Sequence, residues 1–127
     1  MPLLLDTHAL IWWAAGNDIL PADTRRAIYD ADDVFVSAVS AFEITTKFTK
    51  GKLPQAATIA RDVGAYMADQ GFKPLPISIR HAQVAGTLPG PSRDPFDRLL
   101  IAQAIVEGLP FVSIEQPFDA YPIRRLW

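Results

Sequence analysis

Hydrophobic residues along this chain fall into two patterns, short unbroken runs and longer segments in which they recur at helical spacing. Short unbroken runs are typical of strands that are buried on both faces of a sheet. The prolines in one run, Pro74–Ile77, confine it to a sheet edge or to the end of a strand. The predicted strands are Leu3–Leu5, Val34–Ser37, Pro74–Ile77, Phe111–Ile114 and Ile123–Leu126.

The segments with helical spacing alternate with these strands and are bounded by residues that start or stop helices. The last is the best defined, because Asp94 suits an N-cap, Pro95 suits the first helical position and Gly108 ends the apolar face. Alternating strands and helices predict an α/β fold, a three-layer α/β/α sandwich around a central, mainly parallel sheet. The predicted helices are Thr7–Gly16, Pro21–Asp30, Ala38–Phe48, Ala56–Asp69, Ser78–Leu88 and Asp94–Gly108.

Composition narrows the class of protein. The 127 residues carry no internal repeat or interdomain linker, and half are hydrophobic, so we expect a single ordered domain over residues 1–127. The absence of cysteine excludes disulfides, zinc ribbons and thiol catalysis, and it suits a reducing cytoplasm. The first residues include Asp6 and no long apolar stretch, so we expect a soluble cytoplasmic protein with no membrane partner.

Five acidic residues lie where ligand sites form in such folds, at the carboxyl ends of parallel strands. Asp6 ends the first predicted strand, and Glu115 follows the fourth. Asp94 and Asp97 begin one helix, and Glu43 lies in the early turns of another, so we expect all five acids to meet at one edge. Asp6 is the hardest to explain by structure alone, because an acid that closes an apolar strand has little structural purpose.

Clustered carboxylates repel one another and raise one another's pKa unless a cation neutralises them. Ligands that are all oxygen favour Mg²⁺ or Mn²⁺, which activate a water molecule and stabilise charge on a phosphate oxygen. The pattern therefore indicates metal-assisted hydrolysis of a phosphodiester. A net charge of −2 counts against a protein that only binds nucleic acid, but it is compatible with an acidic metal enzyme.

Four of the five acids also have a purely structural interpretation. Asp94 is placed to cap its helix, and Asp97 is placed to complete a capping-box-like arrangement. Glu43 is spaced to pair with Lys47 on one helix face, although its apolar neighbours also predict a half-buried acid. Glu115 can equally be a solvated turn residue.

Four segments carry recognisable motifs in order along the chain, namely Leu3–Leu10, Ser40–Leu53, Arg93–Ala104 and Leu126–Trp127. Together they resemble PIN-domain proteins of the VapC toxin type, over essentially the whole length. This resemblance implies a PIN-like fold and an endoribonuclease that depends on one or two Mg²⁺ or Mn²⁺ ions. It further implies the toxin of a type II toxin–antitoxin pair, which cuts RNA, is held inactive by a small cognate antitoxin and often forms a homodimer.

The resemblance also assigns roles to individual acids. Catalytic acids fall on Asp6, Glu43, Asp97 and Glu115, and metal ligands fall on Asp6, Asp97, Glu115 and Asp94. The family more often has aspartate where this chain has Glu115, and the extra methylene shifts the carboxylate outward. We therefore expect nuclease activity with an altered metal affinity.

Hydroxyl and basic side chains complete the site that the resemblance implies. Thr7 and Ser113 are expected to support the acids by hydrogen bonds, although packing or strand-end hydrogen bonding is the better explanation for Ser113. Lys47, Arg93 and Arg98 lie on segments that flank the acids and are candidates to bind RNA phosphates. Ordinary solvated charge is the alternative for these three.

Three other functions are alternatives to this one, and the sequence counts against the first two. A receiver domain also clusters acids at strand ends, but it needs an early adjacent acidic pair and a separate phospho-acceptor aspartate, and neither is visible. A haloacid-type phosphatase needs a second acid two positions after Asp6, where this chain has His8. A PIN fold that binds RNA or a partner with little or no cleavage is kept open by Glu115.

Overall fold

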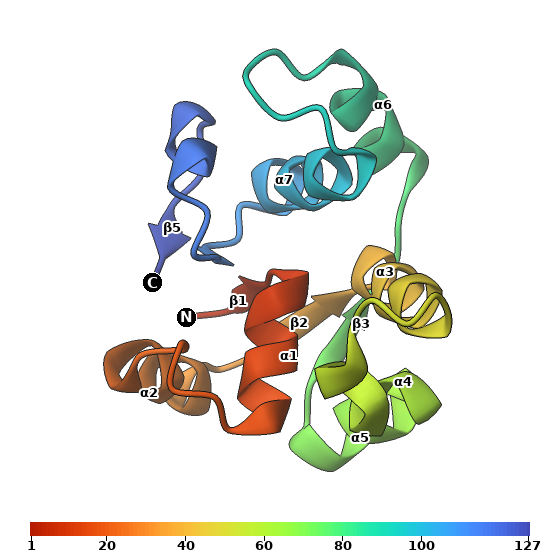
Figure 1. Ribbon diagram of the computed structural model, residues 1–127. Coiled ribbons are helices and arrows are strands. Elements are labelled where there is room, and N and C mark those ends of the chain that lie inside the picture. Colours follow the sequence, from red (N-terminus) through yellow and green to blue (C-terminus); the bar gives the residue numbers. More distant parts are fainter.

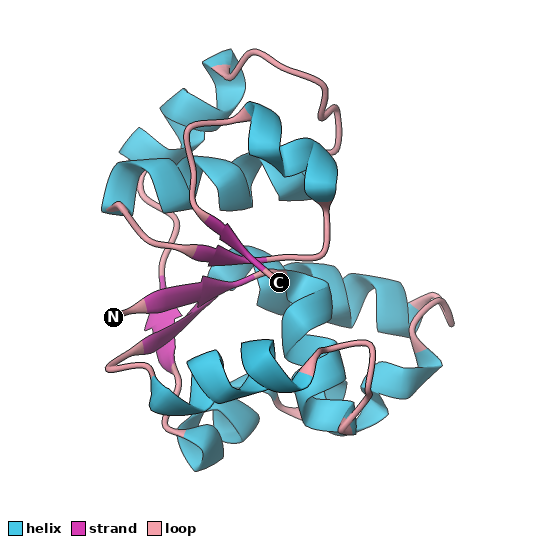
Figure 2. Ribbon diagram, turned by 90° about the vertical axis from the view of Figure 1, so that its left-hand side faces the viewer, coloured by secondary structure: helices cyan, strands magenta, loops and turns pink.

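The computed structural model describes residues 1–127 as a five-stranded parallel sheet between layers of helices (Figures 1 and 2). The predicted three-layer α/β/α sandwich is therefore confirmed. The strands are β1 (Leu3–Leu5), β2 (Val34–Ser37), β3 (Lys73–Leu75), β4 (Phe111–Val112) and β5 (Arg125–Leu126). The α-helices are α1 (Thr7–Ala15), α2 (Ala22–Asp30), α3 (Ala38–Thr49), α4 (Ala57–Arg61), α5 (Val63–Gln70), α6 (Ile79–Thr87) and α7 (Pro95–Glu107). Short 3-10 turns are formed by Pro54–Ala56 and Gln116–Ala120.

The order of the strands fixes where a ligand site can form. All neighbouring strands pair in parallel, in the order β3-β2-β1-β4-β5. The chain thus runs outward from β1 to β3, then crosses the sheet and continues with β4 and β5 on the other side of β1. Ligands bind at such a switch point, outside the carboxyl ends of the two strands between which the order reverses. Here these strands are β1 and β4.

The central strand β1 shows why an unbroken apolar run is needed there. Leu3, Leu4 and Leu5 are all fully buried, but successive side chains face opposite layers. Leu3 and Leu5 pack in the core formed with α1, α2, α4 and α5, and Leu4 packs with α7 in the second core. Helix α3 contributes to both cores, with Ile44 in the first and Val39 in the second. Figure 1 shows α6 and α7 on one side of β1 and the first set of helices on the other.

One predicted helix is wrong. The segment Ala56–Asp69 is not continuous, because Asp62 adopts an extended conformation with φ −158° and ψ 93°. The Asp62 carboxylate accepts a hydrogen bond from the Ala65 backbone N–H at 2.9 Å and caps α5. An aspartate inside an otherwise apolar pattern thus starts a new helix here.

All five predicted strands exist, and the bounds predicted for β1 and β2 are confirmed, but those of the other three differ. The strand expected over Phe111–Ile114 ends at Val112, and the strand expected over Ile123–Leu126 begins only at Arg125. The strand predicted from Pro74 covers Lys73–Leu75 and lies at the edge of the sheet, as its proline requires. None of the seven α-helices has the length and apolar character needed to cross a bilayer.

The loop before α7 generates a stability prediction. Gly90 has φ +110°, and a Cβ there would lie 2.8–2.9 Å from ring atoms of Tyr121. The Tyr121 hydroxyl accepts a hydrogen bond from the Ser92 N–H at 3.0 Å, so the ring cannot move freely. We expect Gly90→Ala to lower the free energy of unfolding by about 1–3 kcal/mol more than Gly16→Ala. Gly16 is the matched control, because it also has a positive φ but has open space around it.

Urea unfolding of the two variants and the wild type measures this difference. Equal destabilisation by both substitutions would show that the contact with Tyr121 has no energetic weight.

Candidate active site

Asp6 lies at the switch point of the sheet, between the end of β1 and the start of α1. Its backbone N–H donates to the carbonyl of Val112 at 2.9 Å, which extends the pairing of β1 with β4. Its carboxylate accepts hydrogen bonds from the Thr7 N–H at 2.8 Å and from the Ser113 hydroxyl at 2.7 Å. Asp6 is only 5% exposed, so these neutral donors hold a buried acid in one orientation.

Burial raises the pKa of Asp6 from its ordinary value of 3.8 to about 6. The hydrogen bonds from Ser113 and Thr7 lower this pKa, and the nearby charge of Glu43 raises it. The loss of hydration thus outweighs the two hydrogen bonds. A carboxyl group in this state gains strongly from a nearby cation.

Helix α3 brings a second acid to the same edge. Its N-cap is Ser37, the last residue of β2, and Ser40 in its first turn shares a hydrogen bond with the Thr7 hydroxyl at 2.9 Å. This bond joins the first turns of α1 and α3. Glu43, one turn further along α3, is 4% exposed and pairs with Lys47 at 2.6 Å. The i,i+4 pair with Lys47 is therefore present, but it is sheltered and not a surface pair, and Glu43 is buried more fully than the half-buried acid that its neighbours predicted.

Helix α7 carries two acids at its N-terminus. The Asp94 carboxylate accepts hydrogen bonds from the Phe96 N–H at 2.8 Å and from the Asp97 N–H at 3.3 Å. The predicted N-cap is thus confirmed, with Pro95 at the first helical position. Asp97 is half-buried in the first turn, and no reciprocal capping box forms with Asp94. The cap uses only the backbone N–H of Asp97, so its carboxylate can take part in the acidic cluster.

Asp97 is the electrostatic centre of the cluster. Its pKa is raised from 3.8 to about 7, first by burial and then by the charges of Asp94, Asp6, Glu43 and Glu115. Each of the other four predicted acids is thus close enough to disfavour ionisation of this carboxyl. The structure thus places the other four acids within electrostatic range of Asp97.

Of the two hydroxyl groups expected to support the acids, only that of Ser113 bonds a carboxylate. The Ser113 hydroxyl donates to Asp6 and accepts from the N–H of Glu115 at 3.1 Å, so it fixes the end of β4. The Thr7 hydroxyl bonds Ser40 instead of a carboxylate, and only its backbone N–H reaches Asp6. Ser40 was not singled out from the sequence, because its role appears only when α1 and α3 are side by side. Glu115 itself is exposed.

The predicted role of Arg98 in RNA binding requires correction. Its guanidinium group donates four hydrogen bonds to the backbone carbonyls of Ala85, Leu88 and Ser92. It therefore holds the end of α6 and the following loop against α7, and little donor capacity remains for phosphate. Lys47 is also engaged, by Glu43, whereas Arg93 is exposed in the loop before α7.

The donor set fits a hard divalent cation. It consists of carboxylate and hydroxyl oxygens, and the pKa values of Asp6 and Asp97 are raised because burial and, for Asp97, neighbouring acids disfavour the charged carboxylates, which a bound cation would stabilise. In the present side-chain conformations, however, no three acidic or histidine residues form a group that could hold a metal ion. Glu43 is turned to Lys47 and Asp94 to the helix N-terminus, so binding requires side-chain rearrangement.

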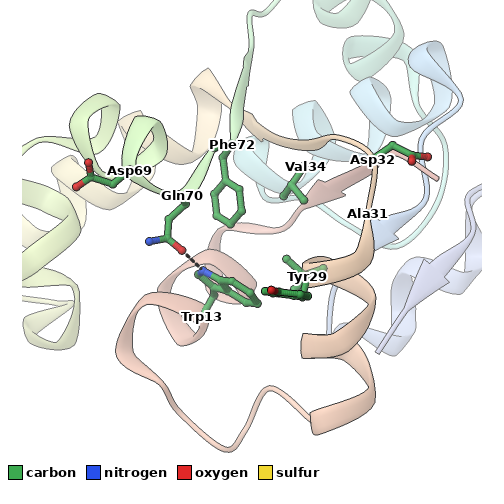
Figure 3. Close-up of a pocket in the computed structure, with 10 residues that line it drawn as sticks. Trp13, Tyr29, Ala31, Asp32, Val34, Asp69, Gln70 and Phe72 are labelled. Carbon is green, nitrogen blue, oxygen red and sulfur yellow. Dashed lines mark hydrogen bonds between the residues drawn. The ribbon is translucent and has the colours of Figure 1, made fainter.

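The cavity drawn in Figure 3 lies elsewhere. It has a volume of about 280 Å³ and contains none of the five acids. Val34 at the start of β2 and Phe72 just before β3 line it, which places it at the amino edge of the sheet. In Figure 3 the Trp13 indole N–H donates to the Gln70 side-chain oxygen, at 2.9 Å. This cavity has no part in the acidic site.

Known proteins share the sequence pattern and the fold. Residues 3–122 match the PIN domain family. Ribonuclease VapC22 from Mycobacterium tuberculosis is 28% identical over 114 residues, which are 87% of this chain and 85% of that protein. The crystal structure of VapBC2 from Rickettsia felis bound to a promoter DNA fragment matches with a TM-score of 0.75 and 15% identity, over 99% of this chain and 98% of the other. DNA-bound VapBC from Salmonella typhimurium matches with a TM-score of 0.69 and 18% identity, over 99% and 97%.

The raised pKa of Asp97 generates a prediction for the metal-free protein. Because its pKa in the folded state is above its ordinary value of 3.8, ionisation of Asp97 disfavours folding, and the stability lost grows as the pH rises from about 4 through 7. We expect Asp97→Asn to raise the melting temperature in EDTA, and to raise it more at pH 8 than at pH 4.5.

Asp69→Asn is the control, because Asp69 is an exposed acid outside the cluster. Thermal unfolding of the three proteins at both pH values measures the effect. A fall in melting temperature for Asp97→Asn at pH 8 would contradict the proposed repulsion among the acids.

Proposed function

Because this chain belongs to the PIN domain family, we propose that it is a metal-dependent endoribonuclease that acts as the toxin of a type II toxin–antitoxin pair. The observation that carries this proposal is the convergence of four other acids on Asp97 at the switch point of the sheet. The likeness to a protein named ribonuclease VapC22 supports the choice of RNA as substrate. A scaffold function alone would not require a buried acid such as Asp6 in this position.

Asp6, Asp97, Glu115 and Asp94 are the proposed ligands for one or two Mg²⁺ or Mn²⁺ ions. When bound, such an ion lowers the pKa of a water molecule and stabilises negative charge on the phosphate that is attacked. The protein itself orients the proposed ligands for the metal ion. The Ser113 hydroxyl and the Thr7 N–H fix the Asp6 carboxylate.

Glu43 and Glu115 complete the proposed catalytic acids. Glu43 is held in the cluster by burial and by Lys47, and Glu115 lies in the exposed segment after β4, from which its charge raises the pKa of Asp97. Arg93, exposed next to Asp94, is the proposed contact for an RNA phosphate.

A PIN-fold protein that binds RNA or a partner without cleavage is the alternative function. Two observations favour it, namely the absence of a preassembled group of three ligands and the glutamate at position 115. The two functions differ in whether divalent metal supports hydrolysis.

A small antitoxin is the proposed partner, and a homodimer is the proposed oligomeric state. Several solved relatives with the same fold are toxin–antitoxin complexes, such as the complex from Klebsiella pneumoniae, which matches with a TM-score of 0.65 and 19% identity over 94% of this chain and 92% of the other. Large exposed hydrophobic side chains on this chain, including Phe42 and Tyr29, are compatible with partner contacts.

Cleavage of RNA with defined metals tests the nuclease. We expect the wild type to cleave RNA in Mg²⁺ or Mn²⁺ and not in EDTA. Asp6→Asn and Asp97→Asn are each expected to reduce the rate by about 100-fold or more, because loss of a ligand should exceed the loss of a group that only orients one. Asp69→Asn is expected to retain the wild-type rate.

Equal cleavage by all four proteins would exclude the proposed site. A wild type that binds RNA but cleaves none with either metal would establish the alternative function.

Induced expression in a bacterial host tests the toxin role separately. The wild type is expected to arrest growth and Asp6→Asn to leave it unchanged, because arrest depends on RNA cleavage. If a small protein is encoded next to this gene, its co-expression is expected to restore growth and to yield a complex on purification. An active nuclease that has no effect on growth would remove the toxin role and leave the enzyme.

A further inference from the structure

The acid cluster already contains one cation. The Lys47 ammonium group lies 2.6 Å from a carboxylate oxygen of Glu43, and the two side chains are 31% and 6% exposed. An ion pair sheltered to this degree is screened less by water and salt than a surface pair. Lys47 therefore belongs to the cluster and is not an ordinary solvated charge.

The same ammonium group faces a second element. It lies 5.8 Å from the ring centroid of Phe96, within the range of a cation–π contact. The pKa of Lys47 is raised, first by its hydrogen bond to Glu43 and further by the charges of Asp94 and Asp97. Helices α3 and α7 lie side by side at this edge (Figure 1). Lys47 thus links the acid of α3 with the acidic N-terminus of α7.

The cluster is divided by this arrangement into two parts. The carboxylate of Glu43 is bonded to a full positive charge, whereas Asp6 receives hydrogen bonds only from the neutral donors Ser113 and Thr7. Asp97 has no side-chain hydrogen bond or salt bridge to a basic residue. One part is already neutralised, and the part made by Asp6 and Asp97 is not.

We propose that Lys47 is the resident cation of the acid cluster, which holds Glu43 away from the divalent ion and confines metal binding to the side of Asp6 and Asp97. This inference rests on the metal site of the proposed function. It adds that Lys47 sets the affinity of that site for the divalent ion. A divalent ion and an ammonium group repel each other, so Lys47 lowers the affinity for metal. Without Lys47, the buried Glu43 carboxylate would become an additional ligand.

The arrangement has a structural reason as well. A buried carboxylate with no partner strongly destabilises a fold. Lys47 therefore allows Glu43 to stay in the cluster while the metal is absent. A purely structural role and the proposed role predict opposite effects on metal affinity, because a loosened site would bind metal more weakly.

Calorimetric titration of the intact chain with Mn²⁺, without RNA, distinguishes the two roles. Lys47→Met keeps the length of the side chain and removes its charge, and we expect the Kd for Mn²⁺ to fall by about tenfold. Lys47→Arg keeps the charge and is expected to stay within about twofold of the wild type. Lys50→Met is the matched control, because Lys50 is an exposed lysine at the end of the same helix.

The rise in melting temperature on addition of Mn²⁺ is a second readout, and we expect it to be larger for Lys47→Met than for the wild type. Should Lys47→Met not unfold cooperatively, Lys47→Gln gives the same test. In a Glu43→Gln background the gain from Lys47→Met is expected to fall by at least half, because no carboxylate is released. An equal gain in that background would overturn the role assigned to Glu43.

Weaker or unchanged Mn²⁺ binding by Lys47→Met would overturn the proposal, and so would an equal gain in Lys50→Met. Failure of the nuclease is distinguishable from failure of this inference. If the wild type cleaves no RNA, but the wild type and its Lys47 and Lys50 variants bind Mn²⁺ with the expected order of affinities, the role of Lys47 is supported and the enzyme is excluded.

Discussion

The hydrogen bond from the Ser113 hydroxyl to the Asp6 carboxylate is the interaction on which the acidic site depends. It joins the carboxyl ends of β4 and β1, two strands that are adjacent in the sheet although the residues are 107 positions apart in the chain. The bond makes a buried carboxylate tolerable where the topology leaves room for a ligand. It also fixes the direction in which Asp6 presents its oxygens to the other acids.

Three helices begin at this edge and favour the same sign of charge. Asp6 caps α1, Ser37 caps α3 and Asp94 caps α7, so the partly positive N-termini of all three helices lie near the cluster. Helix N-termini stabilise nearby anions. This effect, together with Lys47, limits the repulsion that five acids would otherwise cause. The helix N-termini and Lys47 thus lower the cost of negative charge at this edge, although the pKa of Asp97 stays raised while no metal is bound.

Features that depend on local chemistry could be predicted from the sequence. Asp94, Pro95 and Gly108 marked the bounds of α7, and the position of Asp6 after an apolar strand placed it at the edge of the sheet. Features that depend on tertiary contacts were not accessible. The four hydrogen bonds of Arg98 to backbone carbonyls require the folded loop between α6 and α7, and no local pattern distinguishes such an arginine from one on the surface.

The wide separation of Asp6 and Ser113 has a consequence during synthesis of the chain. Strand β4 can enter the sheet only after residues 1–112 have been synthesised, and Asp6 cannot form its hydrogen bond to Ser113 earlier. An incomplete nascent chain therefore lacks the oriented Asp6 carboxylate as well as Glu115. The acidic site is therefore assembled only after Ser113 and Glu115 have left the ribosome.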